Sequence, residues 1–376
     1  MTAPRLEIDL AKLHHNARTL VDRLGARGVA VTAVTKGTLG STAVALELLR
    51  AGVRGLADSR MENIEALRDA GVTAPVTLIR SPMPSQVDRV VAHADVSVNT
   101  EMAVLRLLSA AASDQGRIHG VVLMVELGDL REGILPGDLL GVVRQLRELP
   151  ALRLVGIGAN LACQNGVAPD ARNMGELSAL VDAVERATGD PVDLVSGGNS
   201  ANLEWAFGAT DLGRVNELRL GEAILLGREA LQRRRVDRLY TDVFTLVGEV
   251  IEAQVKPSLP WGDIGQNAFG VAPPVRDRGP VQQAILALGV QDVDVAGIQP
   301  ADGIDILGAS SDHLVLDTGH RALAVGDEVR FQVDYSALLR AMTSPFVAKV
   351  PLAGSEADLG PAITEEAARQ AADAVG

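Results

Sequence analysis

Val29-Ala30-Val31-Thr32-Ala33-Val34-Thr35 is a short run of apolar and β-branched residues, and Lys36 ends it. A helical pattern follows over Ser41–Arg50, and a second β-rich run begins at Arg54. Short apolar runs that alternate with amphipathic helical stretches are typical of βαβ units, in which the strands are parallel. The stretch therefore predicts the first strand, helix and strand of an α/β fold.

The same alternation continues over residues 27–228. Helices are predicted over Asp138–Leu149 and, from the capping-box spacing of Ser59 and Glu62, up to about Gly71. Eight strands, each followed by a helix, are the signature of a (β/α)₈ barrel of the TIM type. The eight β-rich runs are Val29–Thr35, Arg54–Ala57, Pro75–Ile79, Asp95–Val98, Gly120–Glu126, Arg153–Gly158, Val192–Val195 and Asn216–Leu220.

Residues 240–350 differ in character, because helical periodicity fades and Gly and Pro turns separate short β-rich runs. This pattern predicts a smaller, mostly antiparallel β domain. The runs are Val243–Ile251, Gln283–Leu288, His313–Asp317 and Glu328–Val333. We therefore predict a barrel over residues 1–235, a β domain over residues 236–350 and a peripheral tail over residues 351–376.

The composition limits the class of protein. The chain has 376 residues, 47 % of them apolar, so two domains with a sizeable core are expected. A formal net charge of −13 argues against a nucleic-acid partner and against an anionic membrane surface. Cys163 is the only cysteine, the N-terminus lacks a signal-peptide pattern, and the apolar runs are too short to span a bilayer. We predict a cytoplasmic location.

Lys36 is the first candidate for catalysis. In a (β/α)₈ barrel the active site lies at the carboxyl ends of the strands, and Lys36 directly follows the first predicted strand. Partial burial at such a place lowers the pKa of a lysine, as Schiff-base chemistry requires. A lysine that merely extends its amine from a strand end into solvent is the simpler alternative for Lys36 taken alone.

Two glycine-containing loops follow the seventh and eighth predicted strands. They read Ser196-Gly197-Gly198-Asn199-Ser200 and Arg219-Leu220-Gly221-Glu222-Ala223. Glycines let backbone N–H groups turn toward an anion, a helix N-terminus adds a favourable dipole, and barrels often bind phosphate at these two loops. Either loop alone is also compatible with a simple tight turn, but the pair together with a strand-end lysine is more specific.

Two further polar residues follow predicted strands. Arg131, after the fifth strand, is a candidate for contact with a substrate carboxylate or a cofactor oxygen, and a surface ion pair with Asp129 or Glu132 is an equally good interpretation. Asn160, after the sixth strand, either lies under a flat ring or caps its loop. We predict no metal site.

Taken in order, these motifs resemble the fold-type III enzymes that use pyridoxal phosphate, the alanine racemase superfamily, and within it the ornithine racemases. The similarity runs from Leu6-Glu7-Ile8-Asp9-Leu10 to about Lys349. The stretches that carry it are Ala33–Gly37, Ala57–Asn63, Leu127–Gly133, Ser196–Ser200, Leu218–Ala223 and Leu307–Leu314. The resemblance implies a pyridoxal 5'-phosphate enzyme that racemises an amino acid and works as a homodimer with shared active sites.

The resemblance also implies roles for individual residues. Lys36 corresponds to the lysine that holds the cofactor, and Arg131 to the arginine after strand five. The residues that correspond to cofactor contacts are Asn199 and Ser200 beside the phosphate, Gly221 and Glu222 as backbone donors to it, and Arg219 opposite the pyridine nitrogen.

Arg219 bears on the choice of reaction. A carboxylate at this place, as in the related decarboxylases, keeps the ring nitrogen protonated and makes the ring a strong electron sink. An arginine stays charged and cannot accept that proton, so return of a proton to Cα is favoured. Decarboxylation or aldolase-type cleavage remains the alternative reaction. A non-catalytic pyridoxal-phosphate carrier is a third possibility, against which the β domain argues because such carriers lack one.

The sequence departs from the resembled pattern at the second acid/base group. The catalytic tyrosine of alanine racemases has no counterpart in Leu288–Asp294, the tyrosine expected four residues after the lysine is Gly40, and Asn160 stands in place of a ring-stacking histidine. Racemisation needs proton transfer on both faces of a planar intermediate. The candidates for the second group are Cys163, Asp312 and His313.

The missing tyrosines leave room for a longer substrate side chain. Asp292, Asp294 and Asp312 are acids near the predicted mouth, and each can pair with a terminal ammonium group. Solvated turn residues are the alternative, and for Asp294 it is the better one. We predict a basic substrate, ornithine or lysine, with Arg131, Asp292 and Asp312 as substrate-binding residues.

Overall fold

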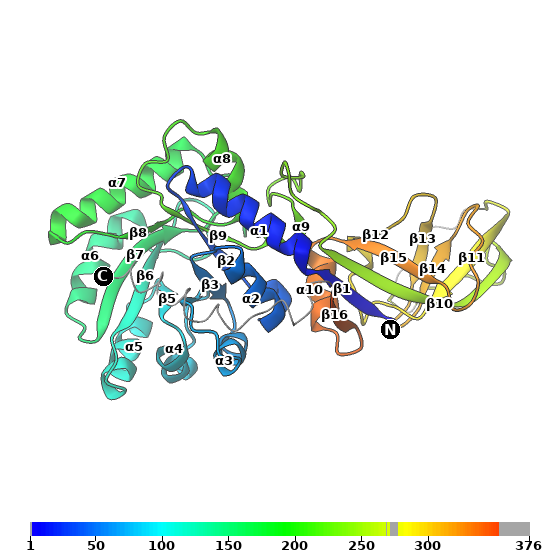
Figure 1. Cartoon of the computed structure of the whole chain (residues 1–376), viewed down its shortest axis with the longest axis horizontal. Coiled ribbons are helices and arrows are strands. Elements are labelled where there is room, and N and C mark those ends of the chain that lie inside the picture. Colours follow the sequence, from blue (N-terminus) through cyan, green and yellow to red (C-terminus); the bar gives the residue numbers. More distant parts are fainter. Residues whose placement is uncertain (1, 268, 271–276, 353–376) are drawn as a thin grey trace. The chain divides into compact units, whose positions relative to one another are not determined.

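The computed structural model describes residues 2–267, 269–270 and 277–352, which divide into two compact units (Figure 1). The barrel unit is Leu10–Thr241. The sheet unit joins residues 2–9 to the described residues from Asp242 to residue 352. Most of the predicted C-terminal tail, residues 353–376, lies outside the described residues.

The barrel unit alternates strands and helices from end to end. Its strands are β2 (Ala30–Val34), β3 (Gly55–Asp58), β4 (Val76–Leu78), β5 (Val96–Asn99), β6 (His119–Val125), β7 (Leu152–Ala159), β8 (Leu194–Ser196) and β9 (Glu217–Leu220). Its helices are α1 (Leu10–Gly25), α2 (Thr42–Arg50), α3 (Met61–Asp69), α4 (Val87–His93), α5 (Met102–Asp114), α6 (Leu139–Arg147), α7 (Ala171–Thr188), α8 (Leu203–Gly208) and α9 (Glu222–Leu226). Four 3₁₀ turns accompany them, η1 (Lys36–Thr38), η2 (Pro84–Gln86), η3 (Pro136–Asp138) and η4 (Ser200–Asn202).

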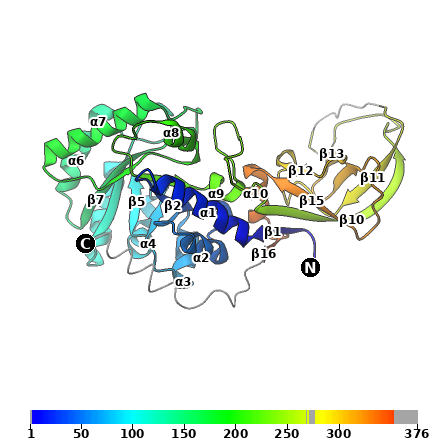
Figure 2. The same cartoon turned by 45° about the horizontal axis from the view of Figure 1, so that its top comes forward.

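Strands β2 to β9 form a closed parallel barrel. Each strand pairs with the next, and β9 pairs with β2 in the register Thr32↔Arg219, which closes the ring. The helices surround the strands, as α2, α3 and α4 do in Figure 2. All eight predicted strands are confirmed, and with them the predicted fold class. Because all strands run the same way, the residues after their carboxyl ends gather at one rim of the barrel.

Apolar side chains fill the space between the strands and the helices. A cluster packs β6 and β7 against α5, α6 and α7, and its members are buried, among them Leu105, Val121, Leu123, Leu139, Val143, Ile157, Leu177 and Val181. The helices cover the outer faces of these apolar strands and remove them from water. Burial of this kind is the main favourable contribution to folding.

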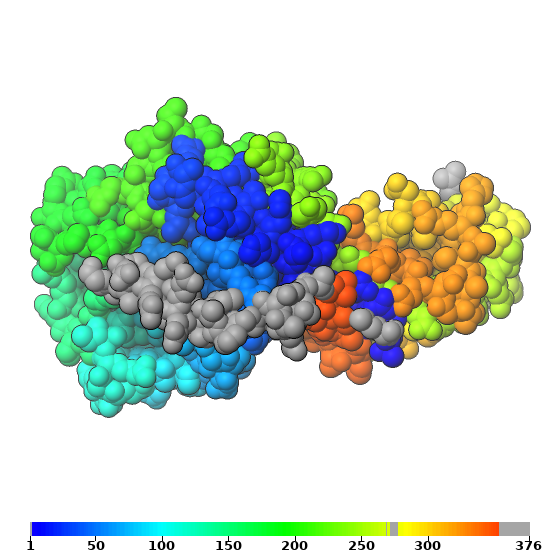
Figure 3. All heavy atoms as spheres, viewed as in Figure 1, coloured from blue at the N-terminus to red at the C-terminus, as the bar shows by residue number. Residues whose placement is uncertain are grey.

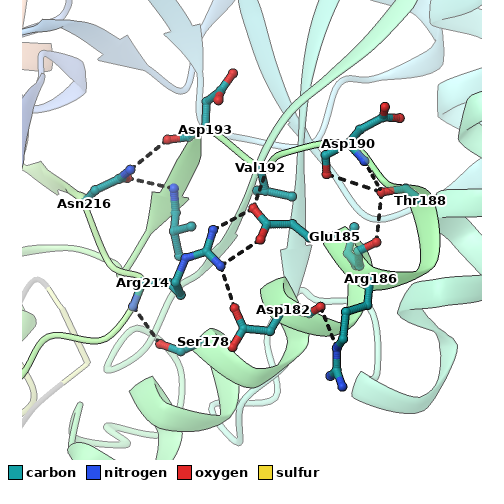
Figure 4. A network of polar contacts seen from close by, with 12 residues as sticks. Ser178, Asp182, Glu185, Arg186, Thr188, Asp190, Val192, Asp193, Arg214 and Asn216 are labelled. Carbon is teal, nitrogen blue, oxygen red and sulfur yellow. Dashed lines mark hydrogen bonds and ion pairs between the residues drawn. The ribbon is translucent and has the colours of Figure 1, made fainter.

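Polar contacts tie α7 to the loops that enter β8 and β9 (Figure 4). Arg214 donates from Nη2 to Glu185 Oε1 at 2.6 Å and from Nη1 to Glu185 Oε2 at 2.9 Å. Val192 N donates to Glu185 Oε1 at 2.8 Å, and Val195 N donates to Asn216 Oδ1 at 2.8 Å. The hydrogen bond from Arg214 is the main reason why the pKa of Glu185 is lowered to about 2.

Helix α1 lies against the segment that follows α9. Asn16 Oδ1 accepts from Tyr240 N at 2.7 Å, and Asn16 Nδ2 donates to Tyr240 O at 2.8 Å and to Ile224 O at 3.0 Å. Figure 3 shows the side chains of α1, in blue, packed beside this segment. Residues 236–241, which the sequence predicted to begin the β domain, therefore belong to the barrel unit.

The sheet unit contains one helix, α10 (Tyr335–Thr343), and a mostly antiparallel sheet. The order of its central strands is β12-β15-β10-β11-β14-β13. The strands are β1 (Arg5–Asp9), β10 (Phe244–Pro257), β11 (Pro280–Leu286), β12 (Ile298–Pro300), β13 (Asp305–Ala309), β14 (Leu314–Asp317), β15 (Glu328–Val333) and β16 (Ala348–Leu352).

Strand β1 differs from the sequence prediction, which assigned residues 1–235 to the barrel. It pairs antiparallel with β10 and parallel with β16, both in the sheet unit. The physical reason is its alternation, because Leu6 and Ile8 are 0 % and 1 % exposed and need a sheet face to cover them.

The capping box predicted from Ser59 and Glu62 is wrong. Helix α3 has Arg60 at its N-cap, without a side-chain capping bond. The carboxylate of Asp58 instead accepts from Arg60 N at 2.9 Å, so an acid at the end of β3 satisfies this donor.

Within residues 2–267, 269–270 and 277–352, no helix combines the length and the apolar character needed to cross a membrane.

Candidate functional site

Lys36 begins η1 directly after β2, at the carboxyl end of the strand. The preceding turn is held by Thr35 N, which donates to Ala57 O at 2.9 Å. Burial lowers the pKa of the Lys36 amine; among neighbouring charges, Cys163 opposes this shift and Arg131 adds to it. The amine therefore stands in a partly desolvated place that favours its neutral, nucleophilic form.

Asp58, at the end of β3, supports the turn that carries Lys36. Its side chain is 0 % exposed and accepts from Thr35 Oγ1 at 2.7 Å and from Asn63 Nδ2 at 2.9 Å. Burial raises the pKa of this carboxyl. Sequence reasoning quoted Asp58 only as part of a motif, and its position next to the lysine turn is a finding of the structure.

Arg219 lies on β9, inside the barrel, and is 6 % exposed. Its Nη2 donates to Ala159 O at 2.9 Å, and its Nη1 donates to Ser196 Oγ. Burial lowers the pKa of Arg219, and the negative charge of Glu217 opposes that shift. Three strands, β7, β8 and β9, thus hold the guanidinium in one place.

Asn199, Asn160 and Cys163 meet at the ends of β7 and β8. Asn199 Nδ2 lies 3.1 Å from Asn160 Oδ1, 2.9 Å from Leu161 O and 3.4 Å from Cys163 Sγ. Among the described residues, the buried Nδ2 of Asn160 has no hydrogen-bond partner. The thiol of Cys163 is exposed. Of the three sequence candidates for the second acid/base group, Cys163 is the one in the barrel unit.

The glycine loop after β8 needs its two glycines. Gly198 has a φ of +141°, and a Cβ there would lie 2.3 Å from Asn202 Oδ1. A Cβ on Gly197 would lie 2.7 Å from Val215 Cγ1. Ser200 Oγ accepts from Ala223 N at 3.1 Å, so the loop after β8 is bonded to the first turn of α9. The backbone of the loop after β8 is accordingly close-packed, and the Ser200 bond joins it to the start of α9, as an anion-binding site at these loops requires.

The side chains of Arg131 and Glu222 are both in ion pairs. Arg131 pairs with Glu132, mainly through side-chain hydrogen bonds that raise the pKa of the arginine. The surface ion pair weighed in the sequence is therefore present, with Glu132 as the partner. Glu222 pairs with Arg233, which leaves its backbone N–H as the group that the resemblance assigns to the phosphate.

Asp129 occupies the loop between β6 and η3 and is 1 % exposed. Its Oδ2 accepts from Cys163 N at 2.9 Å and Gln164 N at 2.8 Å, and its Oδ1 accepts from Asn165 N at 3.1 Å and Val167 N at 3.2 Å. These four bonds together outweigh the effect of burial, and the pKa of Asp129 is lowered. Sequence reasoning considered this residue only as a partner for Arg131.

In the sheet unit, Asp312 and His313 lie at the turn between β13 and β14, and their side chains are 67 % and 46 % exposed. His313 Nδ1 lies 3.0 Å from Asp312 Oδ1, which also accepts from Ser311 Oγ at 3.0 Å. Hydrogen bonds from Ser311 and His313 lower the pKa of Asp312.

This turn touches the stretch in which the tyrosine is missing. Gln291 N donates to Ser311 O at 2.9 Å, and Val290 N donates to Ser310 O at 3.0 Å. A Cβ on Gly289 would lie 2.3 Å from Asp312 N. Asp312 and His313 are therefore neighbours of residues 288–294, as a replacement for the tyrosine would need to be.

Asp292 does not have the exposed carboxylate that the predicted ammonium site needs, and Asp294 caps a turn. Asp292 is 7 % exposed, accepts from Gly289 N at 3.0 Å and accepts from Ser344 Oγ at 3.2 Å. Asp294 is the N-cap of the 3₁₀ turn η5 (Val295–Gly297), where it accepts from Ala296 N at 3.2 Å. Both are turn-stabilising residues, and Asp312 remains as the exposed acid of the three.

Local geometry explains why position 40 carries a glycine and not the tyrosine expected from the resemblance. Its φ is +64°, and a Cβ there would lie 2.8 Å from Asn63 Cβ. A tyrosine at this place is excluded by both the backbone conformation and the space.

Comparisons with known proteins agree with this geometry. The model of the family described as alanine racemase, N-terminal domain, matches residues 8–229. A lysine racemase of Thermotoga maritima is 38 % identical over 93 % of this chain and 99 % of its own length. An ornithine racemase of Acetoanaerobium sticklandii is 37 % identical over 92 % of this chain and 99 % of its own length.

A solved structure shares the fold. The alanine racemase from Streptomyces lavendulae superposes with a TM-score of 0.73 over 95 % of this chain and 99 % of that chain, at 19 % sequence identity. The family match covers the whole of β2 to β9, the strands that carry the glycine loops and Lys36.

Proposed function

Because this chain belongs to the alanine racemase N-terminal domain family, we propose that it interconverts the enantiomers of a basic amino acid, ornithine or lysine, with pyridoxal phosphate as its cofactor. The two full-length relatives, one named a lysine racemase and one an ornithine racemase, support the reaction and the substrate class. The observation that carries the proposal is the half-buried Lys36 amine at the rim that also bears both glycine loops.

The residues at the rim fit pyridoxal phosphate. Lys36 would hold the cofactor, the backbone around Ser200 and Gly221 would receive its phosphate, and Arg219 would face its ring nitrogen. The unpartnered Nδ2 of Asn160 offers a further donor to a bound group. When bound, the cofactor draws electron density from Cα of an amino acid and so makes the Cα proton acidic.

The chain supplies the proton transfers. The lowered pKa of Lys36 favours the neutral amine, which can accept a proton at Nζ on one face of the substrate. Stereoinversion needs a second group on the other face, and Cys163, Asp312 and His313 are the proposed candidates. Arg219 stays charged and offers no carboxylate to the ring nitrogen, which favours proton return over decarboxylation or aldolase-type cleavage.

Substrate recognition is proposed for Arg131 and Asp312. The guanidinium of Arg131 is suited to a carboxylate, although Glu132 already pairs with it, so the substrate must share or displace that partner. Asp312 of the partner subunit would meet the terminal ammonium in a homodimer with shared sites. A cytoplasmic location stays a prediction from the sequence.

The test is a panel of L-amino acids assayed for the D-enantiomer by chiral chromatography. A charge-assisted hydrogen bond to the terminal ammonium predicts a kcat/KM for ornithine or lysine about tenfold above that for alanine. Asp312→Asn should remove most of this preference. Asp305→Asn, a change at another acid of the sheet unit that is 78 % exposed, is the matched control.

Two results would contradict different parts of the proposal. A higher kcat/KM for alanine or serine would exclude the ammonium site while leaving the racemase in place. Release of CO₂ without exchange of the Cα proton in deuterated water would exclude racemisation itself.

A further inference from the structure

Asp129 is a buried carboxylate whose partners are almost entirely backbone groups. Both of its oxygens accept two N–H donors each, and all four donors belong to the loop between β7 and α7, at residues 163, 164, 165 and 167. Its own carbonyl oxygen accepts from Asn165 Nδ2 at 2.7 Å. The loop after β6 is thereby bonded at five points to the loop after β7.

Each of the two joined loops contains a residue with a disfavoured backbone conformation. Leu130 and Ala162 have φ values of 53° and 57°, in the left-handed region that non-glycine residues disfavour. Residues 163–167 lie between the end of β7 and the start of α7, in neither a helix nor a strand. Without an acceptor at Asp129, four backbone N–H groups of this loop would lose their partner.

These loops bear groups of the candidate site. Cys163 is the first of the residues 163–167 that bond to Asp129, and its Sγ lies 3.4 Å from Asn199 Nδ2. Arg131 lies two residues after Asp129 on the other loop. Through Asn199 the segment 163–167 also meets the loop after β8, one of the two glycine loops at the rim that bears Lys36.

We propose that Asp129 is a positioning residue of the racemase, which fixes the loop bearing Cys163 against the Lys36 side of the barrel mouth. The proposal rests on the proposed function for its catalytic consequence. Its structural part, the set of hydrogen bonds from the loop after β7 to Asp129, does not depend on which reaction the protein performs.

The variants are chosen to separate positioning from general stability. Asp129→Asn keeps the size of the side chain but replaces one acceptor oxygen by an NH₂ group, so two of the four N–H donors lose their acceptor in either orientation. Asp170→Asn is the matched control. Asp170 also accepts two backbone N–H donors, Arg172 N at 2.9 Å and Asn173 N at 2.8 Å, and caps α7 a few residues further on.

The first readout is hydrogen–deuterium exchange of the full chain, followed by mass spectrometry of peptides covering residues 161–168. Asp129→Asn should speed exchange there on the order of tenfold, because two charge-assisted bonds no longer oppose local opening. Asp170→Asn should leave this segment within about twofold of the wild type. Unchanged exchange in Asp129→Asn would show that Asp129 does not hold the loop after β7 in place, whether or not the protein is a racemase.

The second readout is steady-state kinetics of the enzyme loaded with pyridoxal phosphate. Asp129→Asn should lower kcat about tenfold with KM changed less than about twofold, since the variant misplaces a group without removing a substrate contact. In a Cys163→Ser background the same change should have little further effect, because residues that act through one another are not additive. A full additional loss in that background, or an equal loss in Asp170→Asn, would show that Asp129 acts only on stability.

Discussion

Single residues at the barrel rim differ in how firmly their surroundings define a role. Lys36 is defined by its place after β2 and by the burial that lowers its pKa. Arg219 is defined by two fixed acceptors, Ala159 O and Ser196 Oγ. Cys163, Asp312 and His313 have chemistry that suits proton transfer, and they are the proposed candidates for the second acid/base group.

Replacement of Lys36 by alanine should abolish cofactor attachment. The purified wild-type protein is expected to be yellow, and borohydride reduction should remove the visible absorbance band and leave a modified peptide that contains Lys36. Lys36→Ala should show neither the band nor the modified peptide. A wild-type protein that stays colourless after incubation with pyridoxal phosphate would contradict the cofactor assignment as a whole.

Arg219→Lys should destabilise the protein although it keeps the charge. An ammonium group cannot make the two divergent contacts of a guanidinium, so at least one buried charge-assisted hydrogen bond is lost. We expect the free energy of unfolding to fall by about 1.5–3 kcal/mol, measured by urea denaturation. Arg233→Lys, at an arginine whose side chain is 57 % exposed, should change it much less.

At the scale of elements, the barrel was predictable and much of the sheet unit was not. The eight barrel strands are apolar runs bounded by helical patterns, and this information lies in the local sequence. Strand β1 alternates apolar and charged residues, but the local sequence does not show that its partners are β10 and β16, far along the chain. Helix α10 was missed next to the predicted strand Glu328–Val333.

The same distinction applies to the candidate site. Lys36 and the glycine loops were found because strand ends can be located from the sequence. Asp129 was missed as a positioning residue because its donors lie at least 34 residues further along the chain. Asp292 was predicted to be at the mouth, but its carboxylate turns inward to Gly289 and Ser344. Contacts between loops depend on the packing of the whole unit, which local patterns do not contain.

The contacts that Glu185 of α7 makes with Arg214 and Val192, in the loops that enter β9 and β8, predict a dependence of stability on pH (Figure 4). In the folded protein the pKa of Glu185 is lowered to about 2 from an ordinary value of 4.5. A lowered pKa means that the carboxylate contributes stability above the ordinary value, and that this contribution is lost as pH falls toward 2. Glu185→Gln should therefore lower Tm near pH 7 and have little effect near pH 2.

Thermal melts of the wild type and of Glu185→Gln at several pH values measure how the difference in Tm depends on pH. Asp190→Asn, a change at an acid whose side chain is 69 % exposed, serves as the control. A Tm difference between wild type and Glu185→Gln that does not vary with pH would contradict the assignment of the effect to the Arg214 contact.

At the scale of the whole molecule, the proposed site draws on both units. Lys36 and Cys163 belong to the barrel unit, and Asp312 and His313 to the sheet unit. In a homodimer with shared sites, a Lys36→Ala subunit and an Asp312→Ala subunit form mixed dimers in which one site carries both changes and the other carries neither.

Mixing Lys36→Ala with Asp312→Ala should therefore restore activity toward ornithine or lysine. With random exchange of subunits, half of the dimers are mixed and one of their two sites is intact, which gives about a quarter of the wild-type activity. Mass spectrometry of tagged subunits verifies the exchange. No recovery after verified exchange would exclude a site shared in this way.

Strand β1 has a consequence for the order in which this protein is made. Arg5–Asp9 leaves the ribosome before the barrel unit, but β10 begins at Phe244, after the whole barrel unit, and β16 follows only at Ala348–Leu352. At about 5–20 residues per second, translation supplies the first partner roughly 10–50 s later. During that time Leu6 and Ile8 lack the strand partners of the folded sheet and can be reached by chaperones or proteases, and the sheet closes only after β16 has been made.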